Sequence, residues 1–66
     1  MEVVINGASR EVPSQISLQE LIRWLELTED RVAVELNRQI IRRESWDGTR
    51  LQDHDRLEIV QFVGGG

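Results

Sequence analysis

Only one segment of this 66-residue chain has the spacing of an amphipathic helix, and the apolar residues around it alternate with a period of two. The apolar residues of that segment recur at i, i+3, i+4 and i+7, and they are Leu18, Leu21, Ile22 and Leu25. This spacing predicts a helix of about ten residues with one apolar face. Ser17 and Glu20 fit a capping box at its start. One helix can cover only one face of a sheet, so we expect an α+β fold in two layers.

Turn-forming residues divide the rest of the chain into strands. Asn6-Gly7 predicts a tight hairpin, because a type I′ turn needs a positive φ angle at both central residues. Pro13 has no amide donor and should end the second strand of that hairpin. Asn37-Arg38 gives a second two-residue turn. The expected strands cover residues 2–6, 9–12, 31–36, 39–41 and 57–63.

Residues 42–55 show neither the helical spacing nor the strand alternation of apolar residues, and they are mainly charged and turn-forming. Trp46 and Leu51 are isolated apolar residues in this segment, and we expect them to attach it to the edge of the core. Asp53-His54-Asp55 could form a metal or acid–base site, although a hydrophilic turn before a strand is the simpler interpretation. Because His54 is the only histidine and the chain has no cysteine, we expect neither a metal site nor catalytic residues.

Charge and hydropathy exclude two classes of partner. The formal net charge is −4, and the longest basic cluster is Arg42-Arg43, so nothing indicates nucleic-acid binding. No apolar stretch approaches the ~20 residues of a membrane span. The first five residues lack the basic and apolar regions of a secretory signal, which favours a cytoplasmic protein.

Three glycines, Gly64, Gly65 and Gly66, follow directly after the last strand. Glycine has no Cβ, so such a segment can lie in a channel too narrow for side chains, and three extended residues reach roughly 10 Å. The group presented there is the α-carboxylate of Gly66, which becomes a reactive acyl donor once a partner enzyme joins it to AMP. A frayed terminus without function is the alternative. We expect residues 1–63 to form a single domain and residues 64–66 a flexible tail.

The whole chain resembles the sulfur carrier proteins of thiamin thiazole synthesis, the ThiS type of ubiquitin-like β-grasp proteins that end in Gly-Gly. The stretches that carry the resemblance are VAVELN at 32–37, II at 40–41, RESW at 43–46, DHDRLEIV at 53–60 and FVGGG at 62–66. The resemblance implies a β-grasp domain, in which one helix packs on one face of a mixed sheet. It also implies a sulfur cycle with no permanently bound cofactor. In that cycle an activating enzyme uses ATP to adenylate Gly66, a cysteine desulfurase route supplies sulfur that leaves a thiocarboxylate, and thiazole synthase takes this sulfur.

Partner docking is expected on the sheet face that the helix leaves open. If Leu57 and Ile59 point into the core, the intervening side chains of the last strand form an exposed apolar strip with a charged rim. The expected docking residues are Val60, Phe62, Ala33, Glu35 and Glu58. The alternative is that Phe62 packs back on a loop as part of the core.

Three other functions stay open at this point. One is the small sulfur-carrying subunit of molybdopterin synthase, although those chains usually run longer. Another is a ubiquitin-like protein modifier. The chain has no lysine, which argues against a modifier that forms polymers of itself. The third is an interaction module with a dispensable tail.

Overall fold

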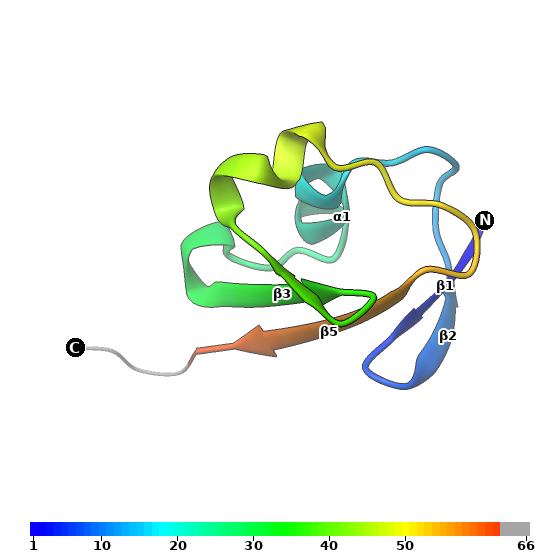
Figure 1. Ribbon diagram of the computed structural model, residues 1–66, viewed down its shortest axis with the longest axis horizontal. Coiled ribbons are helices and arrows are strands. Elements are labelled where there is room, and N and C mark those ends of the chain that lie inside the picture. Colours follow the sequence, from blue (N-terminus) through cyan, green and yellow to red (C-terminus); the bar gives the residue numbers. More distant parts are fainter. Residues whose placement is uncertain (63–66) are drawn as a thin grey trace.

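Five strands form one sheet in the order β2-β1-β5-β3-β4, and helix α1 lies over one face of it (Figure 1). The computed structural model describes residues 1–62, and residues 63–66 lie outside the described part. Strands β1 and β5 run parallel and the other neighbouring pairs antiparallel, so the sheet is mixed, as expected. The elements are β1 (Glu2–Ile5), β2 (Ala8–Glu11), α1 (Leu18–Trp24), η1 (Glu29–Arg31), β3 (Val32–Leu36), β4 (Gln39–Ile41), η2 (Arg43–Gly48) and β5 (Arg56–Gln61).

Both predicted two-residue turns are present. Asn6 and Gly7 have φ angles of 51° and 83° and join β1 to β2. Asn37 and Arg38 have φ angles of 49° and 72° and join β3 to β4. Two consecutive residues with positive φ match the right-handed twist of the paired strands. Strand β2 ends before Pro13, as predicted.

The capping box at the start of α1 is confirmed. The Ser17 hydroxyl accepts a hydrogen bond from the Glu20 backbone N–H at 3.0 Å, and the Glu20 carboxylate accepts one from the Ser17 backbone N–H at 2.9 Å. Donation from the Ser17 backbone N–H, and secondarily from its side chain, lowers the pKa of the Glu20 carboxyl. Each bond satisfies an amide that the first helical turn leaves without a partner.

The predicted length of the helix was wrong. Helix α1 has seven residues rather than about ten, and η1 forms a separate turn after it. The helix ends because Glu26 adopts a φ angle of +62°. The Glu26 N–H then donates to the Arg23 carbonyl, and the Leu27 N–H donates to the Ile22 carbonyl, which together make a Schellman motif. Glycine is the usual residue at this left-handed position, so glutamate gave no signal of a helix end.

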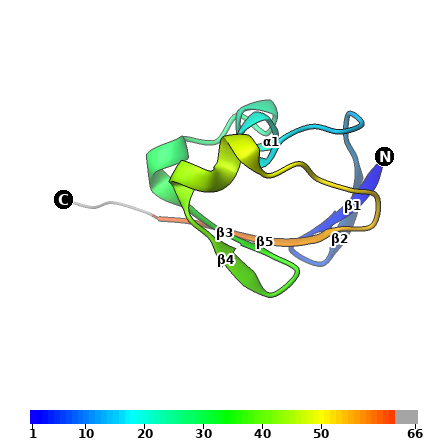
Figure 2. The ribbon, with the colours of Figure 1, turned by 45° about the horizontal axis from the view of Figure 1, so that its top comes forward.

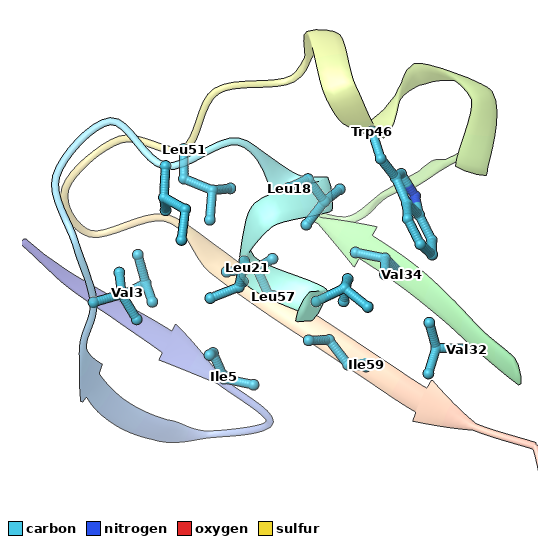
Figure 3. Close-up of a cluster of buried hydrophobic side chains, with 13 residues drawn as sticks. Val3, Ile5, Leu18, Leu21, Val32, Val34, Trp46, Leu51, Leu57 and Ile59 are labelled. Atoms are coloured by element: carbon cyan, nitrogen blue, oxygen red, sulfur yellow. The ribbon is translucent and has the colours of Figure 1, made fainter. Parts of the chain in front are cut away.

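Trp46 and Leu51 attach the irregular segment to the core, as predicted. Trp46 is 1% exposed and Leu51 is 2% exposed, and the Trp46 indole N–H donates to the Ile41 carbonyl at 2.9 Å. The segment is more regular than expected, because it contains η2, which packs against α1 on the same side of the sheet (Figure 2). The buried cluster is shown in Figure 3 and consists of Val3, Ile5, Val12, Ile16, Leu18, Leu21, Ile22, Val32, Val34, Trp46, Leu51, Leu57 and Ile59.

Within residues 1–62, no helix has the length and apolar character needed to cross a bilayer.

Candidate functional site

Strand β5, which leads toward the predicted glycine tail, lies in the middle of the sheet. It pairs with β1 on one side and with β3 on the other. The Phe62 N–H still donates to the Arg31 carbonyl at 2.7 Å, so the backbone is held by its neighbour up to the last described residue. The end of β5 points away from the N-terminus, along the long axis of the molecule (Figure 1). The predicted tail residues, Gly64, Gly65 and Gly66, lie outside the described residues.

The side chain of Asn6 extends the pairing of β5 beyond the end of β1. Direct pairing between β1 and β5 stops at Leu57. The Asn6 carboxamide then takes the place of a strand backbone, because its Oδ1 accepts from the Ile59 N–H at 2.7 Å and its Nδ2 donates to the Ile59 carbonyl at 3.1 Å. From the sequence, Asn6 was expected only to end the first strand and to begin the turn. No local pattern could reveal that it also reaches a strand 53 positions away.

Asn6→Gly is expected to lower the thermal midpoint. Glycine keeps the positive φ angle of the turn but removes both hydrogen bonds, which leaves two partly buried backbone groups of Ile59 without this partner. Such a loss costs about 1–3 kcal/mol, and each kcal/mol lowers the midpoint of a domain of this size by roughly 4–8 °C. Thermal unfolding followed by circular dichroism measures the shift. An unchanged midpoint would show that the contact does not stabilise β5.

The alternation along β5 places its side chains as predicted. Leu57 is 1% exposed and Ile59 9%, whereas Val60 is 57% exposed and Phe62 55%. The alternative in which Phe62 packs back into the core is therefore wrong. Strand β3 adds the expected neighbours, since Ala33 lies directly opposite Val60 and Glu35 lies directly opposite Glu58 in the antiparallel register.

Ile40 is an exposed apolar residue that the sequence analysis did not include. It lies on the edge strand β4, directly opposite Glu35, and is 77% exposed. The two-residue turn at Asn37-Arg38 determines this register, so counting back from the turn could have placed Ile40 on the same face. We use the term open-face patch for these six residues, which lie on the sheet face opposite α1: Ala33, Glu35, Ile40, Glu58, Val60 and Phe62.

A shallow groove of about 140 Å³ lies within the open-face patch, lined by Ala33, Val34, Glu35, Ile40, Glu58 and Val60. Sites for small molecules usually measure about 300–1,000 Å³, so this groove is too small for a cofactor. A larger groove of about 690 Å³ runs beside α1 and includes Trp24 and Arg50. Trp24 is 44% exposed, and the Arg10 guanidinium lies 5.6 Å from the centre of its ring.

The described residues contain no cluster of three or more acidic, histidine or cysteine side chains that could hold a metal ion. The Asp53-His54-Asp55 segment is a turn, as the simpler interpretation predicted. The His54 side chain is 76% exposed and lies 3.4 Å from the Asp53 carboxylate. Such an open pair offers no defined coordination geometry.

Comparison with known proteins places the chain in a family. Residues 3–66 match the model of the ThiS family. The sulfur carrier protein ThiS of Bacillus subtilis (strain 168) is 42% identical over 50 residues, which cover 76% of each chain. A thiazole synthase of Paramagnetospirillum magneticum is 38% identical over all 66 residues, but these span only 20% of that protein.

A solved structure supports the same relationship. The crystal structure of a thiamine biosynthesis protein (ThiS) from Geobacter metallireducens superimposes with a TM-score of 0.85 and 33% identity, and the match covers 100% of both chains. The β-grasp fold implied by the resemblance is thereby confirmed. Since the family model covers nearly the whole sequence and the fold agrees, this chain belongs to the ThiS family.

Proposed function

We propose that this chain is a sulfur carrier for thiazole synthesis in thiamin biosynthesis, and that its reactive group is the carboxylate of Gly66. The observation that carries this proposal is the family match over residues 3–66, which includes the three glycines. The carrier is not itself an enzyme. Its partners perform the chemistry, and residues 64–66 present the carboxylate as a tail on the domain of residues 1–63.

The proposed cycle begins when the Gly66 carboxylate attacks the α-phosphorus of ATP on an activating enzyme. This forms an acyl-adenylate and releases pyrophosphate. A persulfide supplied by a cysteine desulfurase route then attacks the acyl carbon, and AMP leaves. A thiol cleaves the resulting S–S bond and leaves the thiocarboxylate. AMP and sulfur are therefore transient groups on the tail. Because activation consumes ATP, we place the carrier in the cytoplasm.

The receiving partner is proposed to be thiazole synthase. The support comes from the Paramagnetospirillum magneticum thiazole synthase, in which a segment similar to this entire chain is part of the longer polypeptide. A carrier and a synthase that occur in one chain must be able to work next to each other. The same association between separate chains would deliver the thiocarboxylate to its acceptor.

The activating enzyme is proposed to dock on the open-face patch. Val60 and Phe62 are large apolar residues that stay exposed on the strand that leads to the tail. An apolar centre with a charged rim is the usual composition of a protein interface, and here Glu35 and Glu58 supply the charge. Docking at this face would fix β5 against the enzyme and so limit where Gly66 can reach.

Phe62→Ala is expected to weaken binding to the activating enzyme far more than it weakens the fold. Because Phe62 is 55% exposed, its truncation should change the stability by no more than about 0.5 kcal/mol, as for most surface positions. Central aromatic residues of interfaces commonly contribute more than about 1.4 kcal/mol, which corresponds to a tenfold higher Kd. Isothermal titration calorimetry and thermal unfolding measure the two effects. Trp24→Ala is the matched control on the other face, and it should leave the Kd unchanged.

Intact mass of the chain tests the function itself. The protein is incubated with its activating enzyme, ATP, a cysteine desulfurase and cysteine. An oxygen-to-sulfur increment on the C-terminal peptide supports the carrier, whereas covalent conjugates to other proteins would indicate a protein modifier. The loaded carrier is then added to a reconstituted thiazole synthase reaction and, separately, to a molybdopterin synthase reaction. Loss of sulfur from the carrier in the first reaction only would assign it to thiazole synthesis.

A further inference from the structure

Two glutamates of the open-face patch lie directly opposite each other on adjacent strands. Glu35 of β3 and Glu58 of β5 are register partners. Residues in this relationship have Cβ atoms about 4.5–5.5 Å apart, and like charges placed there destabilise a sheet. Within residues 1–62, neither carboxylate forms an ion pair or a hydrogen bond, although Arg38 and Arg56 line the adjoining hollow. The sheet therefore places two glutamates side by side without an ion-pair partner among residues 1–62, in a hollow that two arginines of the same chain also line.

Apolar side chains surround this charge pair. Ile40 lies beside Glu35 on one side, and Ala33 and Val60 lie next along the two central strands. All of them line the same groove of about 140 Å³. A groove that is lined by two glutamates and by aliphatic side chains fits a cationic group on an aliphatic stem, since arginine and lysine pack their methylene groups on apolar surfaces and keep their charge at the tip.

We propose that this groove receives one arginine side chain of the activating enzyme. The proposal rests on the proposed function and specifies how that enzyme is recognised. Glu35 and Glu58 bind the guanidinium, while Ile40 and Val60 contact its stem. Arginine fits better than lysine, because its planar group presents several donors at fixed angles and can bond to two carboxylates at once. Burying this cation between the two glutamates would convert their repulsion into attraction.

Glu58→Gln and Glu35→Gln test the proposal, because they should affect folding and binding in opposite directions. Each variant removes the repulsion in the free carrier, so the thermal midpoint should stay the same or rise. Each also removes a charged acceptor from the complex, so the Kd for the activating enzyme should rise by about tenfold to a hundredfold, the range given by a hydrogen bond between charged groups. Glu26→Gln is the matched control, since it changes the net charge equally at an exposed position outside the patch.

Three results would overturn the proposal. In the first, the patch variants have the same Kd as Glu26→Gln. In the second, sedimentation shows a carrier dimer that Glu58→Gln abolishes, which would assign the groove to a second copy. In the third, magnesium chloride shifts the NMR signals of the two glutamates, which would assign it to a divalent cation. Sulfur loading of the unchanged chain, measured by intact mass, tests the proposed function separately. If the unchanged chain is loaded with sulfur normally while the glutamate variants keep the Kd of the unchanged chain, the proposed arginine contact is rejected and the proposed sulfur-carrier function is not.

Discussion

Deletion of Gly66 is expected to abolish sulfur loading and to leave the thermal midpoint nearly unchanged. The proposed chemistry needs a carboxylate at one particular distance from the docked domain, and removing one residue moves that carboxylate by about 3.3–3.6 Å. Enzymes lose activity steeply when a reacting group is misplaced by as little as ~1 Å. The core is formed by residues between Val3 and Ile59, and the deletion leaves these intact. Intact mass after incubation with the activating enzyme and a sulfur source measures loading.

Gly66→Ala separates the position of the carboxylate from the width of the tail. This variant keeps a carboxylate at the same distance but adds a Cβ, so loading should become slower than in the unchanged chain, yet faster than in the deletion. A truncated chain that still gained sulfur at its new end would show that the enzyme does not recognise the position of Gly66. The central idea of the proposed function would then be wrong.

Trp46→Ala is expected to unfold the protein at physiological temperature or to leave it close to unfolding. Trp46 is the largest of the fully buried side chains, and its ring points toward Val34 beneath it (Figure 3). Replacing a buried tryptophan by alanine typically costs about 3–5 kcal/mol. A domain of 66 residues has a total stability of only about 3–10 kcal/mol by its length. The change also leaves the Ile41 carbonyl without its indole donor.

Trp24→Ala is the control for this experiment, because Trp24 is 44% exposed and lies outside the buried cluster. Trp24→Ala should lower the free energy of unfolding by much less than Trp46→Ala does. Urea unfolding followed by circular dichroism gives both values on one scale. Equal losses for the two tryptophans would mean that η2 does not depend on the Trp46 anchor.

Local signals were sufficient for much of this fold. The Asn-Gly turn, the capping box and the period-two alternation act between residues that are close in sequence, and all three are confirmed. The same alternation separated the buried Leu57 from the exposed Val60 on the last strand. The end of α1 was mispredicted because Glu26 takes a conformation that usually belongs to glycine. Helix propensity predicts the end of a helix poorly when the hydrogen bonds that follow the last turn determine where it ends.

Some features of the candidate site could likewise be predicted from the sequence, and others could not. Its reactive end and the outward-facing residues of β5 could be read from the sequence, because covalent order and alternation determine them. The hydrogen bonds from Asn6 to Ile59 and the pairing of Glu35 with Glu58 depend on which strands become neighbours. Those neighbours are distant in the chain, and strand order results from how the whole sheet buries its apolar face against α1 and η2. Only the tertiary structure could therefore show that two like charges meet at the centre of the open face.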